Sequence, residues 1–124
     1  LHEYTERLYD EAFEAYDAVA ELLKMREQFP LSTMREYLEV ATLEEAPARV
    51  YTCCEVLALV EEDMKAMREL ALEIRNDAAA KDDFAVQSMF EDYVKGFDKQ
   101  LWFLRAMKKN AEAGAAETSC GCSR

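Results

Sequence analysis

The first 28 residues, LHEYTERLYDEAFEAYDAVAELLKMREQ, decide the fold that this sequence predicts. Apolar side chains recur along it every three or four residues, and charged side chains fill most of the positions between them. That spacing is typical of an amphipathic α-helix, about 42 Å long at about 1.5 Å per residue. Pro30 ends it, because the residue before a proline is pushed out of the α region. The apolar stripe consists of Leu1, Leu8, Ala12, Ala15, Val19, Leu22 and Leu23.

Further helices are predicted from capping boxes, in which a Ser or Thr is followed three residues later by Glu or Gln. TMRE at residues 33–36 predicts a short helix that ends near residue 40, and TCCE at residues 52–55 opens a long helix to about residue 76. TLEE at residues 42–45 repeats the signal weakly. The long helix carries a stripe of Val56, Val60, Met67, Leu70 and Ile74.

The last long helix is expected over about residues 83–110, after a polar connection in which Asp82 or Asp83 can cap it. Trp102 is expected in the core. Residues 111–124 are mostly small and polar and are expected to be disordered. The apolar face of this helix includes Phe90, Tyr93, Phe97, Leu101 and Leu104.

The predicted fold is therefore all-α, with three long helices and one short one. Three amphipathic helices of this length usually need a fourth to close a core, as in a four-helix bundle. The chain starts at Leu1 within the helical pattern, without a Met or a capping residue. We therefore expect the first helix of the bundle to be absent from this sequence.

Composition and charge exclude several classes of protein. The 124 residues suit one domain, and 3 Gly and 2 Pro leave little room for the turns of a β-sandwich. The apolar runs are too short for a membrane span. With 26 acidic against 15 basic residues the net charge is −11, which favours cations as partners and disfavours electrostatic binding of nucleic acid.

The four cysteines show no CxxC pair with zinc spacing, and no signal peptide precedes the first helix, so we expect a cytoplasmic protein. Cys53 and Cys54 are interpreted as packing residues at a helix start. Cys120 and Cys122 are interpreted as the end of an unstructured tail, with soft-metal binding or oxidant sensing as the alternative.

Four potential metal ligands share one face of the first helix. His2 and Glu6 lie one turn apart, and so do Asp17 and Glu21. With His2 at zero, the other three fall at about 40°, about 60° and about 100° around the helix axis. His2 and Asp17 are nevertheless about 22 Å apart along that axis, so one ion cannot bridge them within a single helix.

A two-fold axis removes this difficulty. If two copies of the helix pack antiparallel about an axis near Ala12, His2 and Glu6 of one copy meet Asp17 and Glu21 of the other, and the dimer makes two such sites. Imidazole and carboxylates suit divalent iron, manganese or zinc. From the pattern alone, a solvated acidic helix face remains the alternative.

The sequence resembles the Dps family of miniferritins, the DNA-binding proteins from starved cells and their iron-storing relatives. The specific match is Leu1-His2-Glu3, then LYDE at residues 8–11 and DAVAE at residues 17–21. It continues through STMREYL at residues 32–38 and LEEAP at residues 43–47, and it returns in FDKQLW at residues 97–102. The likeness covers about residues 1–110, in order and without obvious gaps.

The resemblance implies a ferritin-like four-helix bundle with a short helix between its second and third helices. Residues 1–110 would be this domain without its first helix, and residues 111–124 a tail. The family forms shells of twelve subunits with ferroxidase sites at two-fold interfaces, where Fe²⁺ is oxidised, usually by hydrogen peroxide, before ferric mineral is stored. By position, His2, Asp17 and Glu21 match the family's ligands, and Glu6 stands where the family commonly has Asp. A further histidine ligand belongs to the absent first helix.

Two departures from the family qualify what the resemblance implies. Asp77, Asp82 and Asp83 are candidates for the pore through which iron enters, although Ser88 replaces a usual pore acid. A Lys-rich terminal tail often binds DNA in this family, but no Lys follows Lys109, so this sequence does not support DNA binding. DNA binding through an N-terminal tail that is absent from this sequence is the alternative.

The leading hypothesis is therefore an iron-oxidising and iron-storing subunit of a homo-oligomeric shell, in which the four predicted ligands bind Fe²⁺ at the interface between two subunits. A non-catalytic acidic helical module that binds a partner helix is the alternative, and an acidic decoy for a nucleic-acid-binding surface is a second one. Neither alternative requires His2, so this histidine and the two i,i+4 pairs, His2 with Glu6 and Asp17 with Glu21, discriminate between the hypotheses.

Overall fold

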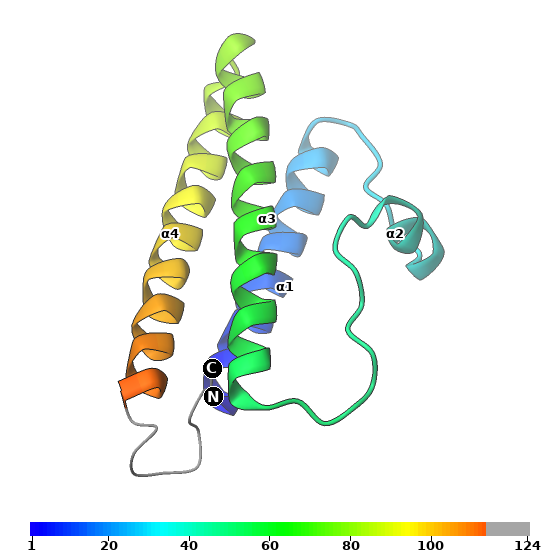
Figure 1. The fold of residues 1–124 in the computed structure, drawn as a ribbon. Helices are drawn as coiled ribbons and strands as arrows, with labels where there is room; N and C mark the ends of the chain where they lie inside the picture. Colours follow the sequence, from blue (N-terminus) through cyan, green and yellow to red (C-terminus); the bar gives the residue numbers. More distant parts are fainter. Residues whose placement is uncertain (114–124) are drawn as a thin grey trace. The chain divides into compact units, whose positions relative to one another are not determined.

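The computed structural model describes the backbone of residues 1–113 and the side chains of residues 1–110. This part of the chain contains four helices and no strand (Figure 1). The chain divides into two compact units, Leu1–Glu45 and Ala46–Arg124. No described helix is both long enough and apolar enough to cross a membrane. The helices are α1 (His2–Met25), α2 (Met34–Val40), α3 (Cys53–Ala80) and α4 (Phe84–Ala113).

In the second unit α3 and α4 form an antiparallel hairpin and lie side by side along their lengths (Figure 1). On α3 the buried apolar residues are Leu57, Ala71 and Ala78, which are separated by multiples of seven residues. Residues at this spacing lie on one stripe of a helix. On α4 the buried residues are Leu101 and Leu104. The two alanines are small, so α4 can approach α3 closely, and the leucines fill the space between the helices.

Three ion pairs join the two helices. Arg68 donates from Nε to Oδ1 of Asp98 over 2.6 Å, and Arg75 donates from Nη2 to Oε1 of Glu91 over 2.7 Å. In the third pair, Nζ of Lys108 on α4 donates to the buried carboxylate of Glu61 on α3. The α3 members of these pairs, Glu61, Arg68 and Arg75, are again spaced by seven residues. The pairs therefore follow the apolar stripe along one side. The pairs of Arg68 and Arg75 are partly exposed and contribute little energy each, but they oppose a shift in helix register.

The predicted stripe on α3 is rotated from the observed one. Val60, Met67 and Ile74 are only partly buried, and Leu70 is 52% exposed. The prediction of a core Trp102 is wrong in the same way, since its side chain is 62% exposed. One residue is about 100° of rotation, so Trp102 points away from the face that Leu101 presents to α3. Periodicity identifies an apolar stripe, but the packing partner decides which flank of it is buried.

Two of the three predicted capping boxes start helices. Thr33 and Thr52 each accept a backbone N–H bond from the Glu three residues later, and that Glu side chain accepts from the backbone N–H of the Thr. The third, at residues 42–45, starts no helix. Pro47 would be the fifth residue of that helix, where it lacks the N–H that would bond to the carbonyl of Leu43 and its ring clashes with the preceding turn.

The turn between α3 and α4 explains why α3 reaches Ala80, a few residues beyond the predicted end. Asp82 has a φ of 56°, a left-handed conformation that ends a helix. Its N–H donates to the carbonyl of Ala79 over 3.2 Å, and the N–H of Asp83 donates to the carbonyl of Ala78 over 2.9 Å. Asp83 then caps α4, because its Oδ1 accepts from the N–H of Val86. Of the two predicted caps, Asp83 is therefore the one used.

Truncation of the most buried side chain should show how far the hairpin depends on its apolar stripe. Leu104 is fully buried, so Leu104→Ala should lower the free energy of unfolding by about 2–5 kcal/mol through lost burial and a cavity. Val50→Ala, at a position 92% exposed, should change it by less than about 0.5 kcal/mol. Urea unfolding followed by circular dichroism measures both, and equal effects would contradict this packing.

The cap of α3 should make stability depend on pH. The backbone N–H of Thr52, followed by the Arg49 side chain, lowers the pKa of Glu55 from 4.5 to about 2. A lowered pKa stabilises the folded state above pH 4.5, and this contribution is lost as the pH falls toward about 2. The thermal midpoint of the unaltered protein should therefore fall as the pH is lowered from 4.5 toward about 2, and in Glu55→Gln this fall should be smaller. Glu73→Gln, at an exposed site on the same helix, is the control, and an equal flattening there would refute the assignment.

Candidate metal site

All four predicted ligands lie on α1, and all four are exposed. The helix is continuous from His2 to Met25, so the i,i+4 spacing holds for both pairs. His2 and Glu6 share one turn near the start of α1, while Asp17 and Glu21 share another near its end. The structure thus brings the ligands together as two pairs on one face of one helix.

The structure does not bring the two pairs together in a single chain. Over the described residues, no three His, Cys, Asp or Glu side chains gather closely enough to hold a metal ion. Fifteen residues separate His2 from Asp17, and a straight helix spaces their Cα atoms by about 22 Å. One chain therefore supplies two half-sites of two potential ligands each.

The three acidic ligands also lack cationic partners. Within the described residues, Glu6, Asp17 and Glu21 take part in no ion pair, whereas Glu61 and Asp98 are bound by Lys and Arg side chains. The hydrogen bond from Lys108 lowers the pKa of Glu61, and the one from Arg68 lowers that of Asp98. Carboxylates that protein cations do not compensate are available to a bound cation.

Exposed aromatic rings occupy the same face of α1, which the sequence interpretation missed. Tyr9, Phe13 and Tyr16 are 60%, 69% and 47% exposed. On a helical wheel with His2 at zero they fall within about 40° of it, beside the ligands. The buried residues Tyr4 and Leu8 lie on the opposite side of the helix, and burial raises the pKa of Tyr4. Spacing alone does reveal the aromatic stripe, but such a stripe is usually interpreted as core.

The short helix α2 extends this apolar surface within the first unit. The hydroxyl of Tyr16 lies 2.5 Å from that of Tyr37, which itself donates to the carbonyl of Leu31 over 3.0 Å. The hydrogen bond to Tyr16, followed by burial, raises the pKa of Tyr37 to about 12. The two rings meet edge to face, with centroids 5.8 Å apart. Nearby on α2, Met34 and Leu38 are also exposed.

The three predicted pore acids gather at the connection between α3 and α4. Asp77 pairs with Lys81 over 2.7 Å, Asp82 takes the left-handed position, and Asp83 caps α4. Each of the three thus has a local structural role. Whether they also line a pore in an assembly stays a prediction.

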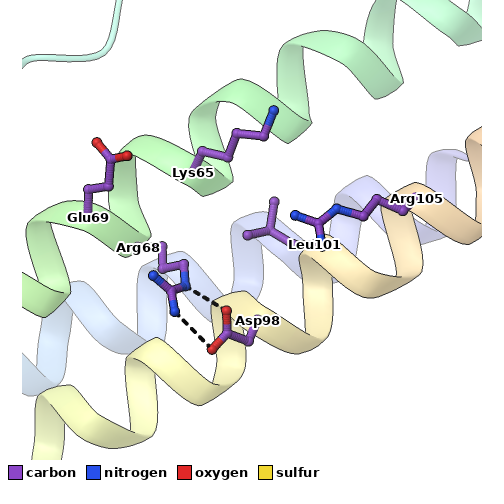
Figure 2. A pocket seen from close by; sticks show the side chains of 6 residues that line it. All are labelled: Lys65, Arg68, Glu69, Asp98, Leu101 and Arg105. Atoms are coloured by element: carbon purple, nitrogen blue, oxygen red, sulfur yellow. Dashed lines mark hydrogen bonds and ion pairs between the residues drawn. The ribbon is translucent and has the colours of Figure 1, made fainter.

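A pocket of about 370 Å³ opens between α3 and α4, and none of the predicted ligands lines it (Figure 2). The guanidinium of Arg68 donates two hydrogen bonds to the carboxylate of Asp98, of 2.6 and 3.2 Å. Its walls contain no His or Cys, so it lacks the soft and imidazole ligands of a transition-metal site. The lining residues are Lys65, Arg68, Glu69, Asp98, Leu101 and Arg105.

The cysteines at the start of α3 differ from the prediction. Cys53 and Cys54 were expected to be packing residues, but both are disulfide-bonded. Periodicity and spacing give no signal for such bonds in a chain with few cysteines. The predictions for Cys120 and Cys122, and for the tail beyond Ala113, lie outside the described residues.

Comparison with known proteins places the whole helical region in one family. Residues 1–113 match the ferritin-like domain. The chain is 33% identical over 110 residues to the DNA protection during starvation protein of Listeria monocytogenes, covering 86% of this chain and 69% of that protein. It is 31% identical over 109 residues to DNA protection during starvation protein 2 of Bacillus anthracis, covering 86% and 72% of the two chains.

A solved structure agrees with these relatives. The crystal structure of antigen TpF1 from Treponema pallidum matches with a TM-score of 0.83 at 26% identity, over 86% of this chain and 68% of that one. The all-helical architecture, the match over residues 1–113 and the identity to these relatives all point to the same group of proteins. The chain belongs to the ferritin-like family, among the DNA protection during starvation (Dps) proteins.

Proposed function

We propose that this chain is an iron-oxidising and iron-storing subunit of a cytoplasmic homo-oligomeric shell. Two copies of α1 pack antiparallel, and each of two sites takes His2 and Glu6 from one copy and Asp17 and Glu21 from the other. The observation that carries the proposal is the pairing of these ligands on one exposed face without protein cations. By the resemblance to the Dps family, the shell contains twelve subunits.

The ligand spacing suits an antiparallel pair. The midpoint between His2 and Glu21 falls between Glu11 and Ala12, and so does the midpoint between Glu6 and Asp17. A two-fold axis at that point therefore sets His2 opposite the partner's Glu21 and Glu6 opposite the partner's Asp17 at the same time. Each half-site on one helix then has its complement at the same height on the other.

The exposed aromatic side chains supply a reason for the helices to associate. Tyr9, Phe13 and Tyr16 surround the centre of the proposed interface, and they would be removed from water when it forms. Three carboxylates and one imidazole would then meet in each site. Their mutual repulsion is relieved when a divalent cation binds, so association and metal binding favour each other.

The chemistry of the site follows from its ligands. Carboxylates and imidazole bind Fe²⁺ and stabilise the Fe³⁺ that oxidation produces. Two Fe²⁺ ions give one electron each to a hydrogen peroxide molecule, whose O–O bond breaks. With two water molecules, the products are two ferric oxyhydroxide units and four protons. Because peroxide takes both electrons, little hydroxyl radical is released, and the ferric product moves on to acidic side chains that nucleate mineral.

Removal of one half-site should abolish rapid iron oxidation. Asp17→Ala/Glu21→Ala should slow the oxidation of Fe²⁺ by peroxide at least about tenfold, because each site loses two of its carboxylates. Ferric absorbance in a stopped-flow instrument measures the rate. Glu44→Ala/Glu73→Ala removes two exposed carboxylates elsewhere and should leave the rate unchanged. If Asp17→Ala/Glu21→Ala oxidised iron at the original rate, the site assignment would be wrong.

A charge on the aromatic face should prevent the association of subunits. Phe13→Glu places a carboxylate next to its symmetry mate near the proposed two-fold axis, so it should shift the protein to smaller species. Light scattering after size-exclusion chromatography measures the mass. Val50→Glu, at another highly exposed apolar position, should leave the mass unchanged. An unaltered mass for Phe13→Glu would support the alternative, an acidic helical module that binds another protein.

A further inference from the structure

The pocket between α3 and α4 gathers basic side chains in a protein that is acidic as a whole. Three of its six lining residues are basic, Lys65, Arg68 and Arg105, and two are acidic, whereas the whole chain has a net charge of −11. Lining residues recur three or four positions apart on each helix, which sets them on the faces where α3 and α4 meet. The α3–α4 hairpin alone therefore builds this pocket, and it is separate from the ligands on α1.

The guanidinium of Arg105 forms no hydrogen bond or ion pair with the described residues. The pKa of Asp98 is lowered first by the hydrogen bond from Arg68, and attraction to Arg105 is the smallest of the effects on it. Arg105 lies one turn after Leu101 on α4, and its guanidinium is directed back toward Leu101 (Figure 2). Because arginine stays charged at physiological pH, Arg105 presents an uncompensated positive charge to the pocket.

The two other basic residues of the pocket have donors to spare. Arg68 donates from Nε and Nη2 to Asp98, which leaves its Nη1 without an acceptor in the described part of the chain. Nζ of Lys65 lies 2.9 Å from Glu62 and 3.2 Å from Glu61. An ammonium group has three N–H donors, so one remains after these two contacts. The pocket thus offers donors from both helices to a ligand that is rich in acceptors.

We propose that this pocket binds a phosphate group through Arg105, Nη1 of Arg68 and Nζ of Lys65. A tetrahedral oxyanion carries acceptor oxygens on several sides, so it can accept from two helices at once. Guanidinium groups also match the oxygens of phosphate in geometry and charge. The pocket volume of about 370 Å³ accommodates the anion together with bridging water molecules.

The acidic surroundings make binding depend on direct contact with these three donors. Repulsion from the net charge of the chain is largely screened beyond about 8 Å at physiological ionic strength. Within the pocket, Glu69 is an exposed wall residue that forms no ion pair over residues 1–110. Figure 2 shows its carboxylate pointing away from Arg105. Glu69 therefore weakens the binding of an anion without blocking the donors.

Titration with inorganic phosphate tests the site, and without iron the result is independent of the proposed iron oxidation. Isothermal titration calorimetry in a phosphate-free buffer should give about one phosphate per chain. Arg105→Gln should weaken binding at least about tenfold, because a hydrogen bond between charged groups is lost. Arg35→Gln removes an exposed arginine of α2 outside the pocket and should leave the affinity unchanged. Unaltered affinity in Arg105→Gln, or equal losses in the two variants, would overturn the proposal.

A gain of affinity provides an independent test. Glu69→Gln should bind phosphate more tightly than the unaltered protein, whereas Glu73→Gln, at an exposed position of α3 outside the pocket, should not. Equal gains in both variants would indicate general attraction and contradict the site.

Other anions identify the source of the phosphate group. Glycerol 3-phosphate that binds at least as tightly as inorganic phosphate would identify a phosphate ester as the ligand, and weaker binding would identify the free ion. Acetate that binds as tightly as phosphate, or no binding of any phosphate compound, would refute the proposal.

Discussion

A straight helix holds residues fifteen positions apart at a separation of about 22 Å, and this constraint shapes how the chain can use its ligands. His2 and Glu6 cannot share an ion with Asp17 and Glu21 of the same α1. A rigid element that carries both halves of a site can complete it only with a second copy. The complementary spacing of the halves about one point of α1 suits such a copy, and it makes assembly and metal binding parts of one equilibrium.

The two units of the chain use acidic residues in different ways. On α3 and α4, carboxylates such as Glu61, Glu91 and Asp98 pair with basic side chains and hold the register of the hairpin. On α1 the acids of the proposed site have no such partners in the described structure, and exposed aromatic rings accompany them. The net charge of −11 is therefore partly structural and partly available to cations from solution.

Much of the fold could be predicted from the sequence, because its helices carry local signals. The capping boxes at Thr33 and Thr52 mark helix starts by their own side-chain bonds, and Asp83 caps α4 as one of two expected candidates. The buried side of α3 and the exposure of Trp102 depend instead on which helix packs alongside, which periodicity does not encode. The ligand face of α1 was predictable in position, since helix geometry fixes it, but its completion by a second chain remains a proposal.

The sharing of each site between two subunits is tested most directly by mixing two inactive variants. His2→Ala/Glu6→Ala and Asp17→Ala/Glu21→Ala should each lack rapid Fe²⁺ oxidation, because each destroys one half of every site. After they are unfolded and refolded together, a mixed pair regains one intact site of its two, so random pairing should restore about a quarter of the original rate. A mixture that stays as inactive as its separate components, although the variants co-assemble, would contradict a site built from two copies of α1.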